Sequence, residues 1–169
     1  MGGALLQDAF GHHGWATIRL IDACAELDEH ELEATSPGTY GSVLETLRHL
    51  VGADSSYLFV LTGGAVAEID EASMGLPELR REMEHNGESW AAYLRGTLDP
   101  GELVVRHRDD GTTSGAPLAI RVAQAIHHGT DHRSQVCTVL TTLGVEPPLI
   151  DVWDFAESQG RLTETPAPG

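Results

Sequence analysis

The feature that most constrains the fold of this chain is an uninterrupted helical pattern from about residue 116 to residue 143. Apolar residues recur along it with the spacing of one helix face, which predicts an amphipathic helix with one buried side. His128 and His132 lie four residues apart at the near edge of this apolar stripe, whereas His127 falls on the opposite side and is directed towards water. The stripe consists of Leu118, Val122, Ala125, Val136, Val139, Leu140 and Leu143.

Two histidines separated by one helical turn can bind the same metal ion, with metal–nitrogen distances of about 2.0–2.1 Å for zinc. Zinc proteases that use such a pair need a glutamate directly after the first histidine, and this chain has Gly129 there. A peptidase is therefore excluded. Because a helix can also repeat histidine by chance, a metal site needs a third ligand from a distant part of the chain.

Three further segments show helical periodicity, and all of them precede the long segment. Ser42 followed three residues later by Glu45 matches a capping box at the start of the second segment. The acidic run after the first segment and residues 65–75 have no pattern of their own, which indicates irregular connections. The three helical segments cover residues 5–27, 42–61 and 76–95.

Four helices with one long crossover connection predict an all-α fold, an up-down-type four-helix bundle. Residues 103–108 alternate in polarity before an Asp-Asp-Gly turn, so a short β-hairpin insert is expected between the third and fourth helices. Residues 149–155 predict a short apolar helix or turn. We expect a single domain over residues 1–160 and a disordered tail over residues 161–169.

Composition excludes several classes of function. Ten basic residues against twenty-six acidic ones give a formal charge of −16, which repels nucleic acids and anionic membrane surfaces. The chain shows neither a signal peptide nor a long apolar run, so a cytoplasmic protein is expected. Cys24 and Cys137 lie on separate helical segments and are expected to be buried small hydrophobic residues rather than a disulfide.

Three other histidines are possible ligands. His12 and His13 project towards the apolar side of the first helix, where a packed or hydrogen-bonded histidine is the alternative to a ligand. His49 shares a narrow face of the second helix with small and polar residues, and periodicity alone places that face at the surface. Helical position therefore does not assign a third ligand.

Three separated blocks of sequence resemble the DinB/YfiT-like family of metal-binding four-helix bundles. They occur in the order of the family and are Ser42-Val-Leu-Glu-Thr-Leu-Arg-His49, His128-Gly-Thr-Asp-His132-Arg133-Ser-Gln135, and Leu143-Gly144-Val-Glu-Pro147-Pro148 with Asp151-Val-Trp-Asp-Phe155. In that family, one histidine of the first block and two of the second bind a divalent metal. The resemblance thus implies His49, His128 and His132 as metal ligands, and it overrides the surface assignment of His49.

The resemblance also implies a class of chemistry. Three neutral imidazoles leave at least one coordination position open, as in catalytic metal sites. Family members with known activities use a low-molecular-weight thiol, such as mycothiol or bacillithiol, in S-transfer or isomerisation. A thiol S-transferase or isomerase acting on a small-molecule substrate is therefore expected, with zinc or nickel as the metal. The alternatives are a metal-dependent hydrolase and a non-catalytic, stress-related metal-binding bundle.

Two expectations concern the surroundings of the metal and the assembly of the protein. Glu45, Asp131 and Gln135 are near the ligands in sequence and are possible hydrogen-bond acceptors for them, whereas Arg133 is expected to pair with a carboxylate of the protein or of an anionic thiol. The resemblance and the apolar segment 149–155 predict a homodimer.

Overall fold

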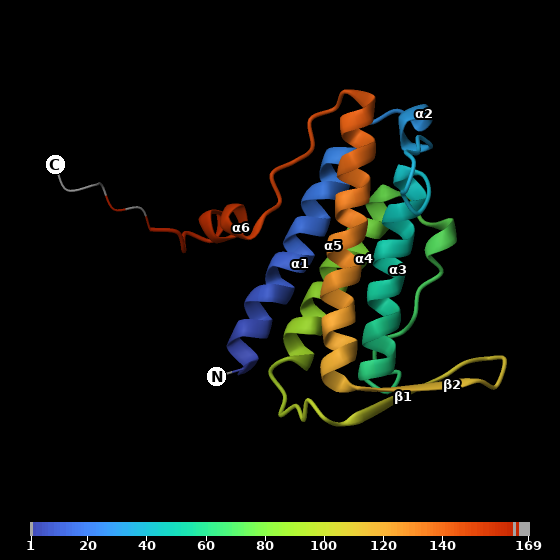
Figure 1. Ribbon diagram of the computed structural model, residues 1–169, viewed down its shortest axis with the longest axis vertical. Helices are drawn as coiled ribbons and strands as arrows, with labels where there is room; N and C mark the ends of the chain where they lie inside the picture. The colour runs from blue at the N-terminus through green and yellow to red at the C-terminus, as the bar shows by residue number, and fades with distance from the viewer. Residues whose placement is uncertain (1, 164, 166–169) are drawn as a thin grey trace.

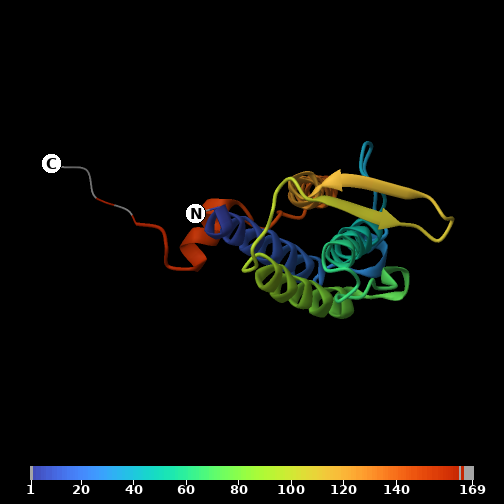
Figure 2. The ribbon, with the colours of Figure 1, turned by 90° about the horizontal axis from the view of Figure 1, so that it is seen from below.

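The computed structural model describes residues 2–163 and 165, and its four long helices lie side by side in a bundle (Figure 1). Each helix contacts two others in the cyclic order α1, α4, α3, α5 (Figure 2). A long connection from the end of α3 returns to the opposite end of the bundle before α4 begins. The predicted four-helix bundle with one crossover is therefore confirmed. The four helices are α1 (Gly2–Cys24), α3 (Val43–Leu61), α4 (Leu76–Tyr93) and α5 (Leu118–Leu143).

Local sequence signals explain where the helices begin and end. Ser42 accepts a hydrogen bond from the backbone N–H of Glu45 at 3.2 Å, and Glu45 accepts one from the N–H of Ser42 at 2.9 Å, so the capping box is confirmed. Helix α5 ends at Leu143 and is followed by Gly144, whose φ of 79° lies in the left-handed region that glycine adopts without strain.

The predicted boundaries need small corrections. Helix α1 ends at Cys24, three residues before the predicted end, and α5 begins at Leu118 because residues 116 and 117 belong to a strand. Part of the acidic connection after α1 forms the one-turn helix α2 (Glu29–Leu32). Asp28 and Glu31 cap this helix with a capping box, which the irregular sequence pattern of the connection did not indicate. A short 3-10 helix, η1 (Glu71–Ser73), lies in the crossover.

The predicted β-hairpin is present at one end of the bundle. Strands β1 (Leu103–His107) and β2 (Thr113–Pro117) pair antiparallel, with Val105 opposite Gly115. Strand β1 contacts α3 and strand β2 contacts α5, so the hairpin extends from the end of these two helices (Figure 2). It is therefore positioned beside the two helices that carry the predicted ligands.

The short apolar segment forms α6 (Val152–Ser158), which contacts α1 and lies at the side of the bundle (Figure 1). Its first turn is capped by the side chain of Asp151, which accepts hydrogen bonds from the N–H groups of Trp153 and Asp154. Of the predicted disordered tail, residues 164 and 166–169 lie outside the described residues.

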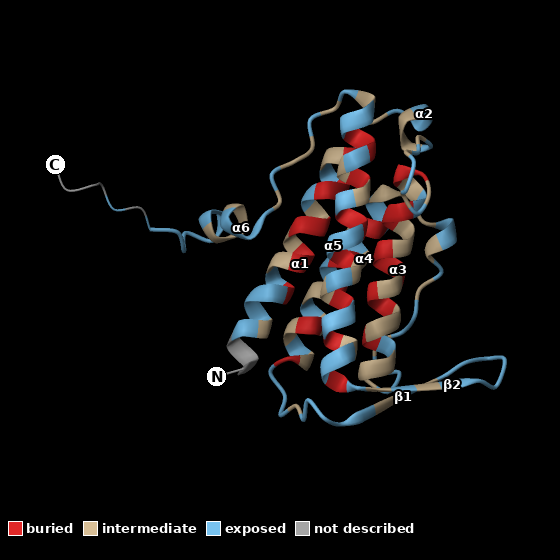
Figure 3. Ribbon diagram, viewed as in Figure 1, coloured by how far each residue is buried: buried red, intermediate tan, exposed pale blue. Residues whose placement is uncertain are grey.

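The interior consists of two apolar clusters separated by a layer of buried polar side chains. Figure 3 shows the buried residues along all four long helices. One cluster contains Leu20, Ile21, Cys24, Val43, Leu47, Val51, Leu79, Met83, Val136, Val139 and Leu140. The other contains Phe10, Leu58, Trp90, Leu94, Leu118, Val122 and Ala125. Between them, each long helix contributes a buried polar residue; these are His13, Thr17, Asp54, Ser55, Asn86 and Arg133. Both cysteines are free, as predicted, although Cys137 is only half-buried.

Candidate metal centre

Three histidines converge between α3 and α5, near the middle of both helices. His49 lies on α3 and the pair His128 and His132 on α5, and one ligand atom from each lies within 4.8 Å of the others. The Nε2 atoms of His49 and His128 are 3.0 Å apart. Two nitrogens bound to one tetrahedral zinc ion would be about 3.3 Å apart, because each lies about 2.0–2.1 Å from the metal. This donor set therefore fits a divalent ion with small adjustments, and the three histidines could hold one.

Hydrogen bonds outside the cluster orient its members. The Nδ1 of His132 lies 3.1 Å from the Oε1 of Gln135, which also accepts a hydrogen bond of 2.9 Å from the backbone N–H of Tyr40. An amide oxygen only accepts, so the Nδ1 of His132 is the donor of this hydrogen bond, which leaves Nε2 as the nitrogen that could bind a metal. The ring of Tyr40 stacks on His49 at 4.1 Å between centroids.

Of the three possible acceptors for the ligands, Gln135 is the one that the structure places in contact. Glu45 is engaged in the capping box of α3, and Asp131 is exposed.

Partial burial favours the neutral form of two of the three histidines, His49 and His128. Burial, followed by the neighbouring His132 and His49, lowers the pKa of His128 to about 4. Burial also lowers the pKa of His49, followed by the effect of His132. Metal binding requires unprotonated imidazole nitrogens. At neutral pH these two histidines are therefore available as ligands without prior loss of a proton.

A cavity of about 460 Å³ opens beside the cluster. His49 and His128 form one end of it, and its floor is the narrow face of α3 that follows His49. That face carries small side chains, which leave room above the helix; they are Gly52, Ala53 and Ser56. Periodicity alone places this face at the protein surface, but it lines a cavity because the crossover and the hairpin enclose it. The remaining lining residues are Tyr57, Glu68, Ile69, Glu71 and Arg106.

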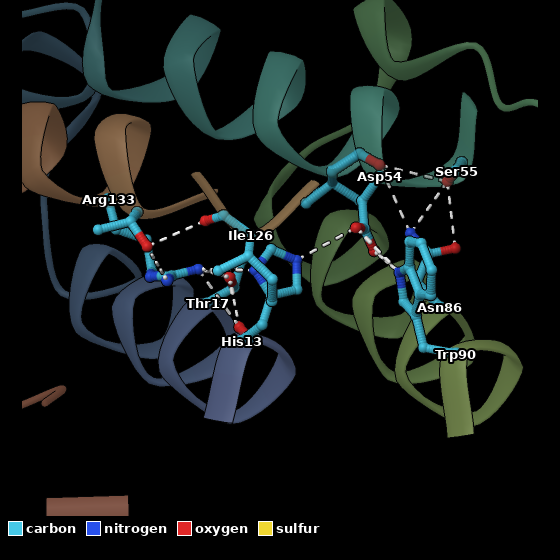
Figure 4. Close-up of polar contacts among 10 residues, drawn as sticks. His13, Thr17, Asp54, Ser55, Asn86, Trp90, Ile126 and Arg133 are labelled. Carbon is cyan, nitrogen blue, oxygen red and sulfur yellow. Dashed lines mark hydrogen bonds and ion pairs between the residues drawn. The ribbon is translucent and has the colours of Figure 1, made fainter. Parts of the chain in front are cut away.

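A buried chain of hydrogen bonds lies between α5, α1 and α3 (Figure 4). The guanidinium of Arg133 donates to the Nδ1 of His13 at 3.0 Å, so the proton of His13 is on Nε2, which donates to the Oδ1 of Asp54 at 3.1 Å. The indole N–H of Trp90 donates to the same carboxylate at 3.0 Å. Burial lowers the pKa of Arg133 to about 10 while Asp54 opposes this, so the guanidinium is charged at neutral pH.

These contacts decide two questions that the sequence left open. Both ring nitrogens of His13 are hydrogen-bonded within the layer, and the Nε2 of His12 lies 2.8 Å from the carbonyl oxygen of Ile150. The hydrogen-bonded alternative thus holds for both histidines. Arg133 does not make the predicted direct pair with a carboxylate of the protein, because its guanidinium donates to His13, Thr17 and Thr130, and the imidazole of His13 separates it from Asp54. Its pairing with an anionic thiol stays a prediction.

The same layer explains Gly129. A Cβ atom at this position would lie 2.3 Å from Cε1 and 2.5 Å from Nδ1 of His13. The space that a side chain after His128 would occupy is therefore filled by an imidazole from α1. Sequence reasoning did not identify this layer, although polar residues at core positions, such as Asp54 in the apolar stripe of α3, were a signal for it.

The fold and the site place the protein in a class: it is an all-α four-helix bundle in which three histidines from two neighbouring helices could hold a metal ion. The chain belongs to the DinB family, whose family model matches residues 3–166. The resemblance seen in the sequence is thus confirmed over nearly the whole chain. Comparison with curated proteins found no matching sequence. Within the described residues, the helices are all too short or too polar to cross a membrane.

Proposed function

We propose that this protein binds a divalent metal ion through His49, His128 and His132 and uses it in a thiol-dependent S-transfer or isomerisation. The observation that carries the proposal is the convergence of three imidazoles within 4.8 Å at the end of a cavity of about 460 Å³. Three protein ligands leave a coordination position for a small molecule, and the cavity offers space for it. An all-imidazole set suits zinc and nickel, the two metals proposed here, as well as iron and copper. A single domain over residues 1–160 would carry the whole site.

The side chains around the cavity have separate roles in this chemistry. A divalent ion lowers the pKa of a bound thiol and so favours the nucleophilic thiolate near neutral pH. Glu71 lies against Gly52, and its charge partly opposes the lowering of the pKa of His49, so its carboxylate is near the cluster and could relay the thiol proton to solvent. The hydroxyl of Tyr57 accepts a hydrogen bond from Gln124 at 3.4 Å, so its own proton remains available to a substrate.

Metal analysis tests the ligand set. Wild-type protein should retain one divalent ion per chain, and each of His49→Ala, His128→Ala and His132→Ala should lose most of it. His127→Ala is the matched control, because this exposed side chain lies next to His128 but outside the cluster. Stoichiometric metal in His49→Ala would overturn the three-ligand proposal.

Calorimetry tests the role of the thiol. Addition of mycothiol or bacillithiol to the metal-loaded protein, measured in buffers of different ionisation enthalpy, should show release of a proton. The His132→Ala variant should show neither binding nor proton release. If no thiol binds at millimolar concentration, transfer chemistry is excluded.

Glu71 also supports a metal-dependent hydrolase as the second possibility. Hydrolysis needs a general base for the attacking water, and the sequence offers none directly after His128. The crossover supplies a carboxylate to the cavity from a different part of the chain. A hydrolase would cleave test esters without any thiol, and Glu71→Gln should abolish that cleavage while metal content is unchanged.

The third possibility, a non-catalytic metal-binding bundle, would be favoured by a fourth protein ligand that closes the site. The two histidines considered for this role, His12 and His13, are engaged in other hydrogen bonds. This observation supports an open site.

We also propose that the protein is a homodimer. The segment around α6 exposes three large apolar side chains, and their exposed fractions are 69% for Leu149, 59% for Val152 and 70% for Trp153. Leu5 at the start of α1 lines one hollow together with Val152, and exposed apolar surface of this kind is what proteins bury in interfaces. Light scattering at tens of micromolar should show a dimer, and Trp153→Ser should shift it towards monomer. A monomeric wild-type protein would exclude this assembly.

A further inference from the structure

An arginine lines the same cavity as His49 and His128. Arg106 extends from strand β1, and its guanidinium donates to the Oγ of Ser56 at 2.5 Å and to Glu68 at 3.0 Å. Among the described residues that line the cavity, Arg106 is the sole arginine or lysine. It thus provides a positive charge at a defined position in an otherwise acidic protein.

The positions of His49 and Ser56 on α3 set the distance between the histidines and Arg106. Ser56 follows His49 by two helical turns, which corresponds to about 10 Å along α3. A ligand that binds the metal at one end and Arg106 at the other must span a similar distance. Free cysteine is too short for this, whereas a thiol of tripeptide size is long enough.

The present partner of Arg106 is replaceable. The side chains of Arg106 and Glu68 are 34% and 42% exposed, and ion pairs with this access to water are weak. A guanidinium binds a carboxylate through two parallel N–H donors, so a carboxylate on a ligand can take the place of Glu68.

We propose that Arg106 binds a carboxylate of the thiol that the metal centre holds, so that the protein uses a carboxylated thiol in preference to an uncharged one. This inference rests on the proposed thiol-dependent function and adds the substrate class. Glutathione and bacillithiol have the required carboxylates, whereas mycothiol has no charged group besides its thiol. Arg106 is then a specificity-determining residue that lines the same cavity.

Binding to the metal-loaded protein, measured by calorimetry with three probes, tests the inference. Glutathione carries thiol and carboxylates, its diethyl ester lacks the carboxylates, and S-methylglutathione lacks the thiol. Wild-type protein should bind glutathione at least about tenfold more tightly than the ester, since a charged hydrogen-bonded pair is lost. Arg106→Gln should bind both equally, and Glu68→Gln should bind glutathione more tightly than wild type does. Arg108→Gln, an exposed arginine on the same hairpin, should behave as wild type.

The outcomes separate this inference from the function on which it rests. If glutathione binds more tightly than S-methylglutathione but the ester binds as well as the acid, the thiol function stands and the role of Arg106 is overturned. If S-methylglutathione binds as tightly as glutathione and Arg106→Gln weakens both, the carboxylate contact stands and the thiolate function is overturned. If Arg106→Gln lowers thermal stability but leaves the binding of all three probes unchanged, Arg106 has only a structural role and the inference is overturned. If none of the three probes binds, both proposals are overturned.

Discussion

Replacement of Gly129 by alanine tests the layer of buried polar contacts beneath the metal centre. Alanine normally stabilises a helix interior by about 1 kcal/mol relative to glycine. Here the added Cβ would lie 2.3 Å from the ring of His13. That ring cannot turn aside without breaking its hydrogen bonds, because Arg133 and Asp54 hold its two nitrogens. The helix gain and the steric cost therefore have opposite signs.

The steric cost should exceed the gain. Overpacking of a well-packed core costs about 1–3 kcal/mol, and a buried polar group that loses its partner costs about 1–3 kcal/mol more. After the helix gain is subtracted, Gly129→Ala should lower the free energy of unfolding by about 1–5 kcal/mol. For a chain of this size that corresponds to a decrease in Tm of about 2–20 °C.

Urea unfolding followed by circular dichroism measures this change, and Gly87→Ala in α4 is the matched control. A Cβ at Gly87 would have no heavy atom within 4 Å, so this variant should be more stable than wild type by about 0.5–1 kcal/mol. If Gly129→Ala is as stable as wild type, or gains as much as Gly87→Ala, the ring of His13 is not held as described.

Three further predictions concern the same centre. The pKa of His128 in the folded, metal-free protein is about 4, below the ordinary 6.5, so the unfolded chain takes up the proton first as the pH falls. The stability contributed by the neutral imidazole is thus fully present above pH 6.5 and is lost between pH 6.5 and about 4. The free energy of unfolding should fall by roughly 2 kcal/mol over this range after allowance for partial exposure. Urea unfolding that gives the same free energy at both ends of the range would contradict this. Asp54→Asn should cost about 3–5 kcal/mol, since it leaves the buried charge of Arg133 without its counter-charge, and a loss below about 1 kcal/mol by urea unfolding would count against the layer. Gln135→Leu should weaken metal binding by about 10- to 100-fold in a competition assay with a chelator while the stoichiometry at saturation is unchanged, and an unchanged affinity would remove Gln135 from the centre.

The sequence predicted those features of the fold that depend on residues close together in the chain. Helical periodicity, the capping box at Ser42 and the turn at residues 109–111 are local signals, and each corresponds to an element of the structure. The pair His128 and His132 was found in the same way, because two residues four apart on a helix share a face whatever surrounds it. The short helix α2 was missed because one turn is too short to show a period.

Only the tertiary structure decided what surrounds these elements. Periodicity gave His49 a face of small and polar residues, but whether such a face meets water or lines a cavity depends on the crossover and the hairpin that lie over it. His13, Asp54 and Arg133 come from three helices, and their hydrogen bonds join residues far apart in the chain. Arg106 meets Glu68 for the same reason. A helix wheel carries information about one helix at a time, whereas burial and hydrogen bonding are properties of the space between helices.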